Sequence, residues 1–218
     1  MIKKADHENP ARSTKLAQTN RLPKLGKGTA VVVTGTPGTG KTTISRILAR
    51  KLGASCINPQ YFMRREGIDF TYDRNRKTRI VSIRRLRKAI DERAERTDHG
   101  LVIESHINPV TGPLPKLVRV IVLRCDPLIL EQRLERKRWS KSKIGENLQA
   151  EILDICLWDA VKHYGWNRIL EIDTSRRTPH QVIQLVIRGL KMKRLQGRPK
   201  VDWMSTLKRR WILSHYLE

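Results

Sequence analysis

Acidic residues are few in this sequence: 21 Asp and Glu stand against 45 Lys and Arg in 218 residues, which gives a formal net charge of +24. So large an excess of positive charge is more than solubility requires, and it indicates a polyanionic partner or an unusual ionic environment. Long apolar runs are lacking as well, since none reaches the ~18 to 20 residues of a membrane span. We therefore expect a soluble protein.

Cysteine is also scarce. The sequence has three cysteines, Cys56, Cys125 and Cys156. They are widely spaced and no CxxC pair or Cys/His cluster accompanies them, so we expect buried thiols in a reducing compartment and no metal site built on the cysteines. Residues 1–28 lack the apolar segment of a secretory signal. Their basic and hydroxyl residues have a faint likeness to a transit peptide, but Asp6 and Glu8 favour a disordered basic tail.

One segment is rich in glycine and threonine: residues 35–43 read GTPGTGKTT and follow the apolar run at residues 30–34. The segment matches GxxxxGK followed by Ser or Thr, in the strand–loop–helix setting that this motif requires. Glycines permit backbone angles and close approaches that a Cβ would block, so successive N–H groups can converge on phosphate oxygens. The glycines concerned are Gly35, Gly38 and Gly40.

A cation and a hydroxyl close the same motif. Lys41 is placed to contact the β- and γ-phosphates, and the Thr42 hydroxyl to bind Mg²⁺. The helix that begins here presents its positive N-terminal end to the anion. The segment therefore predicts a polyphosphate-binding loop; a glycine-rich turn that matches by chance is the alternative.

Apolar strands and helices alternate along the chain. Expected strands are residues 30–34, 55–57, 100–104, 119–124 and 168–173. Expected helices are residues 41–52, 127–136, 144–164 and 178–192, with a helical basic insert at residues 58–96. This alternation predicts an α/β fold of the P-loop NTPase class, with a mainly parallel sheet that is buried on both faces.

Three polar residues follow strand ends, where ligands of such sheets bind. Glu104 closes an expected strand and can hold a Mg²⁺-bound water or orient an attacking group. His106, two residues on, lies within reach of the same site. Arg64, just past the second strand, is placed to clamp a second phosphate group, although an arginine on a helix is more often surface charge.

Basic residues gather in separate regions. Residues 74–88 hold eight basic residues and no acid, and residues 188–218 hold nine basic residues against two acids. Solvated helix faces are one reading of such runs. Nucleic-acid contact is the other, because aromatic residues are interleaved with the basic ones in the second region. These aromatic residues are Trp203, Trp211 and Tyr216.

Together these segments resemble a known family, the small adenylate-kinase-like ATPases of archaea and eukaryotes known as adenylate kinase isoenzyme 6 or coilin-interacting nuclear ATPase. The resemblance covers about residues 30–190 and rests on TGTPGTGKTT, INPQYFMRREG, VIESH and LERKRWSKSKIGENLQAEI. It implies a nucleoside monophosphate kinase-like fold with monophosphate-binding and lid inserts. The family's N-x-Q-x-E positions hold Asn147, Gln149 and Glu151.

The resemblance also assigns roles to parts of the chain. Residues 58–82 would form the monophosphate-binding region and residues 136–146 the lid of a kinase-like domain at residues 29–194, which a basic aromatic extension at 195–218 follows. His106 would serve an ATPase activity. The residues that would bind ATP are Gly38, Gly40, Lys41, Thr42 and Thr43.

Several residues depart from the family's pattern. Glu104 replaces a common aspartate and keeps its charge, and Tyr61 stands where an aspartate is frequent. Lys137 takes the place of a lid arginine, and a lysine point charge is not equivalent to a planar guanidinium on phosphate. Residues 74–88 are basic where relatives are often acidic. These departures preserve the expected ATP site and question the specificity for the monophosphate.

The family acts in maturation of the small ribosomal subunit. The resemblance implies ATP and Mg²⁺ as cofactors, AMP or another nucleoside monophosphate as acceptor, and a small-subunit ribosomal protein and rRNA as partners. It implies a cytoplasmic protein, or a nuclear one in a eukaryotic cell. Three functions stay open: an ATP:AMP phosphotransferase with ATPase activity, a nucleotide-switched assembly factor, and a small-metabolite kinase. Because every candidate catalytic residue precedes Arg177, we expect phosphoryl transfer to survive removal of residues 195–218.

Overall fold

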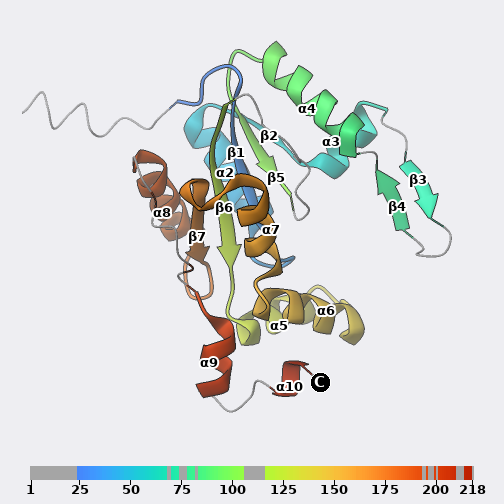
Figure 1. The fold of residues 1–218 in the computed structure, drawn as a ribbon, viewed down its shortest axis with the longest axis vertical. Helices are drawn as coiled ribbons and strands as arrows, with labels where there is room; N and C mark the ends of the chain where they lie inside the picture. The colour runs from blue at the N-terminus through green and yellow to red at the C-terminus, as the bar shows by residue number, and fades with distance from the viewer. Residues whose placement is uncertain are drawn as a thin grey trace, which may run out of the picture.

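A five-stranded sheet forms the centre of the molecule (Figure 1). The computed structural model describes residues 24–67, 70–73, 78–81, 83–105, 116–192, 195, 199, 201–209 and 214–217. Its strands are β1 (Thr29–Gly35), β2 (Ser55–Ile57), β5 (Leu101–Glu104), β6 (Lys116–Arg124) and β7 (Ile169–Asp173). The strands lie in the order β2-β5-β1-β6-β7, and each pairs in parallel with its neighbour. The expected α/β fold with a parallel sheet is confirmed.

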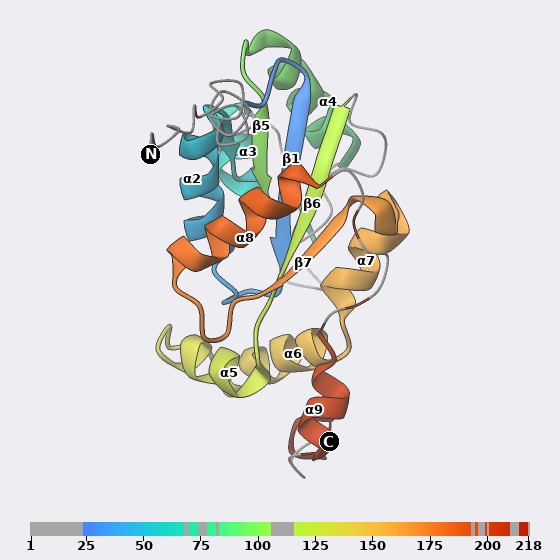
Figure 2. The same ribbon diagram turned by 90° about the vertical axis from the view of Figure 1, so that its left-hand side faces the viewer.

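Helices cover both faces of this sheet, because successive strand residues point to opposite sides and both sides are apolar. Val31 and Val33 of β1 contact one layer of helices, while Ala30 and Val32 contact the other. Figure 2 shows α8 crossing the sheet on the side where α2 lies. The first layer contains α2 (Lys41–Leu52) and α8 (Pro179–Lys191). The second contains α3 (Pro59–Arg65), α4 (Ile83–Arg96) and α7 (Ile155–Tyr164), with the short 3₁₀ helix η1 (Trp166–Arg168) packed nearby.

A third hydrophobic cluster lies beyond the carboxyl ends of the strands. It contains residues of α5 (Pro127–Glu135) and α6 (Lys141–Ile152), and of the two C-terminal helices α9 (Trp203–Arg209) and α10 (Ser214–Leu217). Leu207 is fully buried there, and Trp203 and Tyr216 are each only 7% exposed. The interpretation of these two aromatic residues as nucleic-acid contacts is therefore wrong, since buried rings cannot stack on bases. Trp211 lies outside the described residues.

The basic insert is not entirely helical as expected. After α3 it contains two strands, β3 (Phe70–Asp73) and β4 (Thr78–Val81), which pair antiparallel and stand apart from the central sheet (Figure 1). Their sequences, FTYD and TRIV, are rich in β-branched and aromatic residues, which favour strands. The expectation of a helix gave weight to the basic residues of this segment and not to its preference for strands.

The single long helix expected at residues 144–164 is also wrong. The chain forms α6 and α7 with a break at Leu153 and Asp154, where Asp154 adopts a left-handed backbone conformation with φ of 57°. Arg124 explains the break, because its Nη2 donates to the Glu151 carbonyl at 2.9 Å and to the Asp154 carboxylate. The buried guanidinium of Arg124 thus binds the C-terminal end of α6.

Other expectations meet mixed outcomes. The thiol of Cys125 is buried as expected, whereas Cys156 is half-buried and Cys56, on the edge strand β2, is exposed. Leu25 already belongs to the core, so packing begins before residue 29. Within the described part of the chain, no helix is long and apolar enough to cross a membrane.

Candidate active site

The glycine-rich loop joins β1 to α2 at the carboxyl edge of the sheet. Gly35, Gly38 and Gly40 have φ values of 135°, 95° and 98°, which lie in the region that favours glycine. A Cβ on Gly35 would lie 2.3 Å from the Leu123 carbonyl oxygen, so no other residue fits there. Gly40 is the N-cap of α2 and offers no side-chain acceptor, which leaves the first amides of the helix available to an anion.

Lys41 points its ammonium group back into this loop. Its Nζ donates to the carbonyl oxygens of Gly35 at 2.6 Å and Thr36 at 3.1 Å, and the residue is only 8% exposed. Burial lowers the pKa of Lys41 to about 8, although neighbouring acidic groups such as Glu104 oppose the shift. The loop therefore holds a desolvated cation where an anion would gain most from it.

A hydroxyl and a carboxylate meet beside Lys41. The Thr42 Oγ1 donates to Glu104 Oε1 at 2.5 Å, and Glu104, at the end of β5, is only 7% exposed. β5 lies directly beside β1, with Val33 opposite Glu104. Both groups are hard oxygen ligands of the kind Mg²⁺ prefers, so this donor set fits the predicted ion. Among the described residues no larger cluster of metal-ligating side chains exists, so nucleotide oxygens and water would complete the coordination.

Glu151, near the end of α6, is hydrogen-bonded to the glycine-rich loop. Its Oε2 accepts a hydrogen bond from the hydroxyl of Thr36, the second residue of the loop. Its Oε1 accepts from Arg124 Nε at 2.8 Å and from the Cys125 amide at 3.0 Å. Only 1% of the residue is exposed. The loop is thus bonded to an element more than a hundred residues further along the chain.

Arg124, the last residue of β6, is the centre of a buried ionic cluster. It is 1% exposed and pairs with Glu151 at 2.8 Å, with Glu171 at 2.7 Å and with Asp154. Burial opposes its charge, but the carboxylates outweigh burial and raise the pKa of Arg124. Burial also raises the pKa of Asp154, against the opposing effect of Arg124. The cluster fixes β6, β7 and α6 relative to one another.

A second link joins the loop to the segment after β7. The hydroxyl of Thr174 donates to the Thr39 carbonyl at 3.0 Å and the Arg124 carbonyl at 2.9 Å. Arg133 of α5 donates to the carbonyls of Thr174 and Ser175 at 3.0 and 3.1 Å. The loop is therefore held by contacts on the α6 side and on the β7 side.

The remaining predicted site residues have mixed placements. Thr43 is exposed in the first turn of α2, and Lys137 is exposed in the short loop between α5 and α6. The charge of Lys137 reaches Lys41, whose pKa it helps to lower. Arg64 is exposed on α3, which lies near β2 (Figure 1). Among the residues that the structure describes, no hydrogen bond or ion pair joins Arg64 to the glycine-rich loop. His106 lies outside the described residues.

Thr36, Arg124 and Glu151 carry parts of the site that the sequence did not assign. The sequence marks Glu151 only as a motif position, and Arg124 only as the end of a strand. One signal was available: an arginine that ends an otherwise apolar, buried strand needs a buried counter-ion. The partner itself could not be named, because contacts over 27 residues leave no periodic pattern.

The loop, the parallel sheet and the helical layers define the class of P-loop kinase-like folds. Comparison with known proteins agrees: the family described as "AAA domain" matches residues 31–154. A protein of Methanocaldococcus jannaschii named "Putative adenylate kinase" is 32% identical over 173 residues, which is 79% of this chain and 92% of that protein. A protein of the same name from Pyrococcus abyssi is 34% identical over 175 residues, 79% of this chain and 90% of that protein.

A solved structure is similar in fold. A sugar kinase from Janibacter sp. HTCC2649 superposes with a TM-score of 0.51 at 21% identity, covering 78% of this chain and 96% of its own. At 21% identity, this similarity is evidence for the fold alone. On the sequence relatives, the chain belongs to the adenylate-kinase-like P-loop family.

Proposed function

We propose that this protein transfers the γ-phosphoryl group of ATP to a nucleoside monophosphate, with AMP as the first candidate, and that it hydrolyses ATP slowly when no acceptor is bound. The observation that carries the proposal is the desolvated Lys41 beside the Thr42–Glu104 pair, in a loop shaped for phosphate. The family relationship supports a nucleotide kinase.

Each residue has a role in this scheme that follows from its position. The ammonium of Lys41 neutralises charge on the transferred phosphoryl group, and the loop amides bind the phosphate oxygens. Thr42 and Glu104 would hold Mg²⁺, which would supply charge neutralisation of the phosphates when bound. Lys137 approaches the phosphates as the lid closes and water leaves. Arg64 binds the phosphate of the acceptor only if the monophosphate-binding region moves toward the loop.

His106 is proposed for the ATPase side of the activity. Phosphoryl transfer depends on positioning and charge neutralisation more than on covalent chemistry. The same loop therefore serves a monophosphate or a water molecule as the attacking group. Under this proposal Glu104, at the end of β5, and His106 decide which of the two attacks.

We expect ATP affinity to fall with rising pH. The free Lys41 has a pKa of about 8 because it is buried. Phosphate oxygens favour its charged form, so nucleotide binding raises the pKa of Lys41. At a pH above about 8, binding therefore takes up a proton. Affinity then falls roughly tenfold per pH unit above that value. Titration calorimetry in two buffers of different ionisation enthalpy measures both the affinity and the proton uptake; a flat profile between about pH 7.5 and 9 would remove Lys41 from phosphate binding.

An acceptor panel tests the proposed reaction. Product formation from ATP is compared with AMP, with other nucleoside monophosphates, with shikimate and gluconate, with small-subunit rRNA, and with no addition. A rate that rises with AMP or another monophosphate supports the proposal. A rate that rises only with a small metabolite favours the alternative kinase, and one that rises only with rRNA favours an assembly factor.

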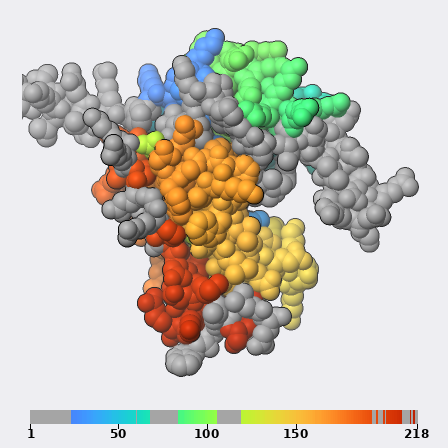
Figure 3. All heavy atoms as spheres, viewed as in Figure 1, coloured from blue at the N-terminus to red at the C-terminus, as the bar shows by residue number. Residues whose placement is uncertain are grey.

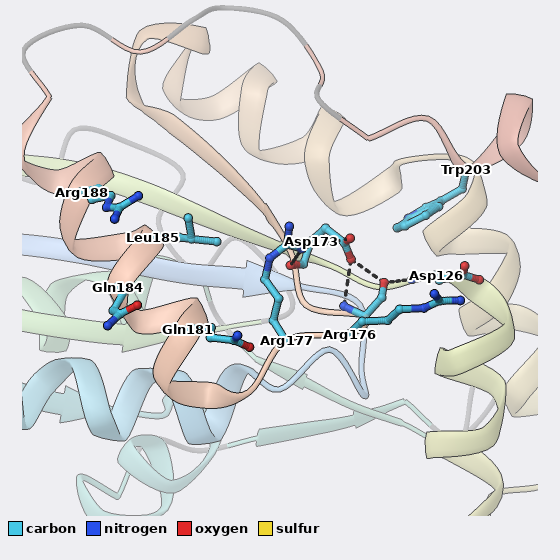
Figure 4. Close-up of a pocket in the computed structure, with 10 residues that line it drawn as sticks. Asp126, Asp173, Arg176, Arg177, Gln181, Gln184, Leu185, Arg188 and Trp203 are labelled. Carbon is cyan, nitrogen blue, oxygen red and sulfur yellow. Dashed lines mark hydrogen bonds and ion pairs between the residues drawn. The ribbon is translucent and has the colours of Figure 1, made fainter.

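The assembly-factor alternative keeps one structural observation in its favour. A cavity of about 630 Å³ lies beside the C-terminal end of β7, between α8 and Trp203. Figure 4 shows Arg188 on α8 and Arg176 on the loop after β7 around it. Both arginines are exposed, and within the described part of the chain neither has an ion-pair partner. Such arginines suit RNA phosphates.

The basic run at residues 74–88 supports this alternative less than its composition suggests. Part of its charge is paired one helical turn later, since Arg87 contacts Asp91 at 3.7 Å and Lys88 contacts Glu92 at 4.0 Å. Exposed pairs of this kind are weak, but they lower the net charge that α4 presents. A small-subunit ribosomal protein as partner remains part of the same alternative.

A further inference from the structure

The C-terminal helix α9 contacts the carboxylate that supports the phosphate-binding loop. Trp203, the first residue of α9, donates from its Nε1 to Glu151 Oε1 at 3.0 Å. Figure 3 shows the C-terminal segment (red) packed against the segment that contains α6 (yellow). Trp203 lies beyond residues 31–154, the part that the family description matches.

The hydrogen bonds of Glu151 divide between its two oxygens. Oε1 accepts from Arg124 Nε, from the Cys125 amide and from Trp203 Nε1, at 2.8 to 3.0 Å. Oε2 accepts from the Thr36 hydroxyl. Three donors on one oxygen fix the plane of the carboxylate, and the other oxygen is thereby aimed at the loop.

Thr36 passes this position on to Lys41. Its carbonyl oxygen accepts from Lys41 Nζ at 3.1 Å and from the Thr39 hydroxyl at 2.8 Å. A continuous series of contacts therefore runs from Trp203 through Glu151 and Thr36 to the ammonium of Lys41. Every member of the series is less than 9% exposed, so water does not compete for these bonds.

We propose that Trp203 is a positioning residue for the phosphate-binding loop, so that docking of α9 sets the ATP affinity of the site. The proposal rests on the proposed function only in taking this loop as the ATP site. It reverses the expectation that phosphoryl transfer survives removal of residues 195–218, because removal takes one of the donors from Glu151. By linkage, ATP must also strengthen the docking of α9.

Two variants make a matched pair. Trp203→Phe removes the indole donor and keeps an aromatic ring at a buried position of α9. Tyr216→Phe removes a donor from the same tail, where the hydroxyl donates to Glu131 Oε2 at 2.9 Å, without touching Glu151. Both residues are 7% exposed, so the two changes perturb similarly buried sites.

We expect Trp203→Phe to raise the Kd for ATP about tenfold, since a hydrogen bond to a charged group is lost. Tyr216→Phe should leave this Kd within about twofold of the wild-type value. It should lower the midpoint of urea unfolding about as much as Trp203→Phe does. Calorimetry of ATP binding to the full chain gives the first quantity and urea unfolding the second. Equal ATP affinity in the wild type and Trp203→Phe would overturn the proposal, as would equal losses of affinity in both variants.

Hydrogen exchange keeps the proposal testable if Trp203→Phe fails to fold. In the wild-type chain a non-hydrolysable ATP analogue should slow exchange of the α9 amides, and no change there would overturn the proposal. Both readouts measure binding without an acceptor. Failure of the wild type to phosphorylate any monophosphate would therefore contradict the proposed function. The role of Trp203 would still be decided by the ATP affinity and by hydrogen exchange.

Discussion

Replacing Lys41 with Ala is expected to abolish both phosphoryl transfer to a monophosphate and ATP hydrolysis while the fold remains. The ammonium lies inside the loop and would meet the charge that develops on the transferred group. Loss of one such preorganised donor typically lowers kcat by ~10²–10³-fold. The folded state already disfavours this charge, as the lowered pKa of Lys41 shows, so its removal should cost little stability.

Steady-state rates with and without AMP, together with thermal unfolding, measure this effect. Lys51→Ala is the matched control, because Lys51 is an exposed lysine in the last turn of the same helix. It should keep wild-type rates. Wild-type turnover in Lys41→Ala would remove the loop from the account, and a loss of fold would reveal a structural role instead.

Replacing Arg124 with Met is expected to destabilise the protein strongly, by about 3–5 kcal/mol. The change leaves the carboxylates of Glu151, Glu171 and Asp154 buried or half-buried without their shared cation. A buried charge without a partner is costly, and one partner cannot be removed from such a cluster without that cost. The free energy of unfolding from urea titration measures the loss.

The pH dependence of this variant follows from Asp154. Burial already raises the pKa of Asp154 in the folded state against the opposing effect of Arg124, so removal of Arg124 raises it further above its value in the unfolded chain. The folded state then binds more protons, so the stability deficit should shrink as the pH falls from about 7.5 to 5. Arg50→Met, which changes an exposed arginine of α2, should show neither effect. A loss no larger than that of Arg50→Met would mean that the cluster contributes nothing to stability.

The sheet, most of its helices and the phosphate-binding loop could be predicted from the sequence because their signals are local. The loop needs glycine at Gly35 for close contact with Leu123, and this need appears directly in the motif. The boundaries of α2 and β2 were predicted to the residue, since Gly53 ends the helix in a left-handed conformation. Apolar runs likewise located the five parallel strands.

The parts that could not be predicted depend on contacts between distant segments. Arg124 breaks the helix before Asp154, although the sequence there continues a helical pattern. Trp203 lies in a basic, aromatic stretch typical of nucleic-acid contacts, yet its side chain is buried and its indole Nε1 donates to Glu151. Neither arrangement leaves a signal at a fixed spacing, because the partners come together only in the folded chain.

The most direct test of the account is the stoichiometry of the reaction, followed by phosphorus NMR with Mg²⁺ and ATP in the presence and absence of AMP. Transfer to AMP predicts two ADP for each ATP consumed, with inorganic phosphate appearing only slowly. Consumption of ATP that yields one ADP and one inorganic phosphate, at a rate that AMP does not change, would contradict the assignment as a nucleoside monophosphate kinase.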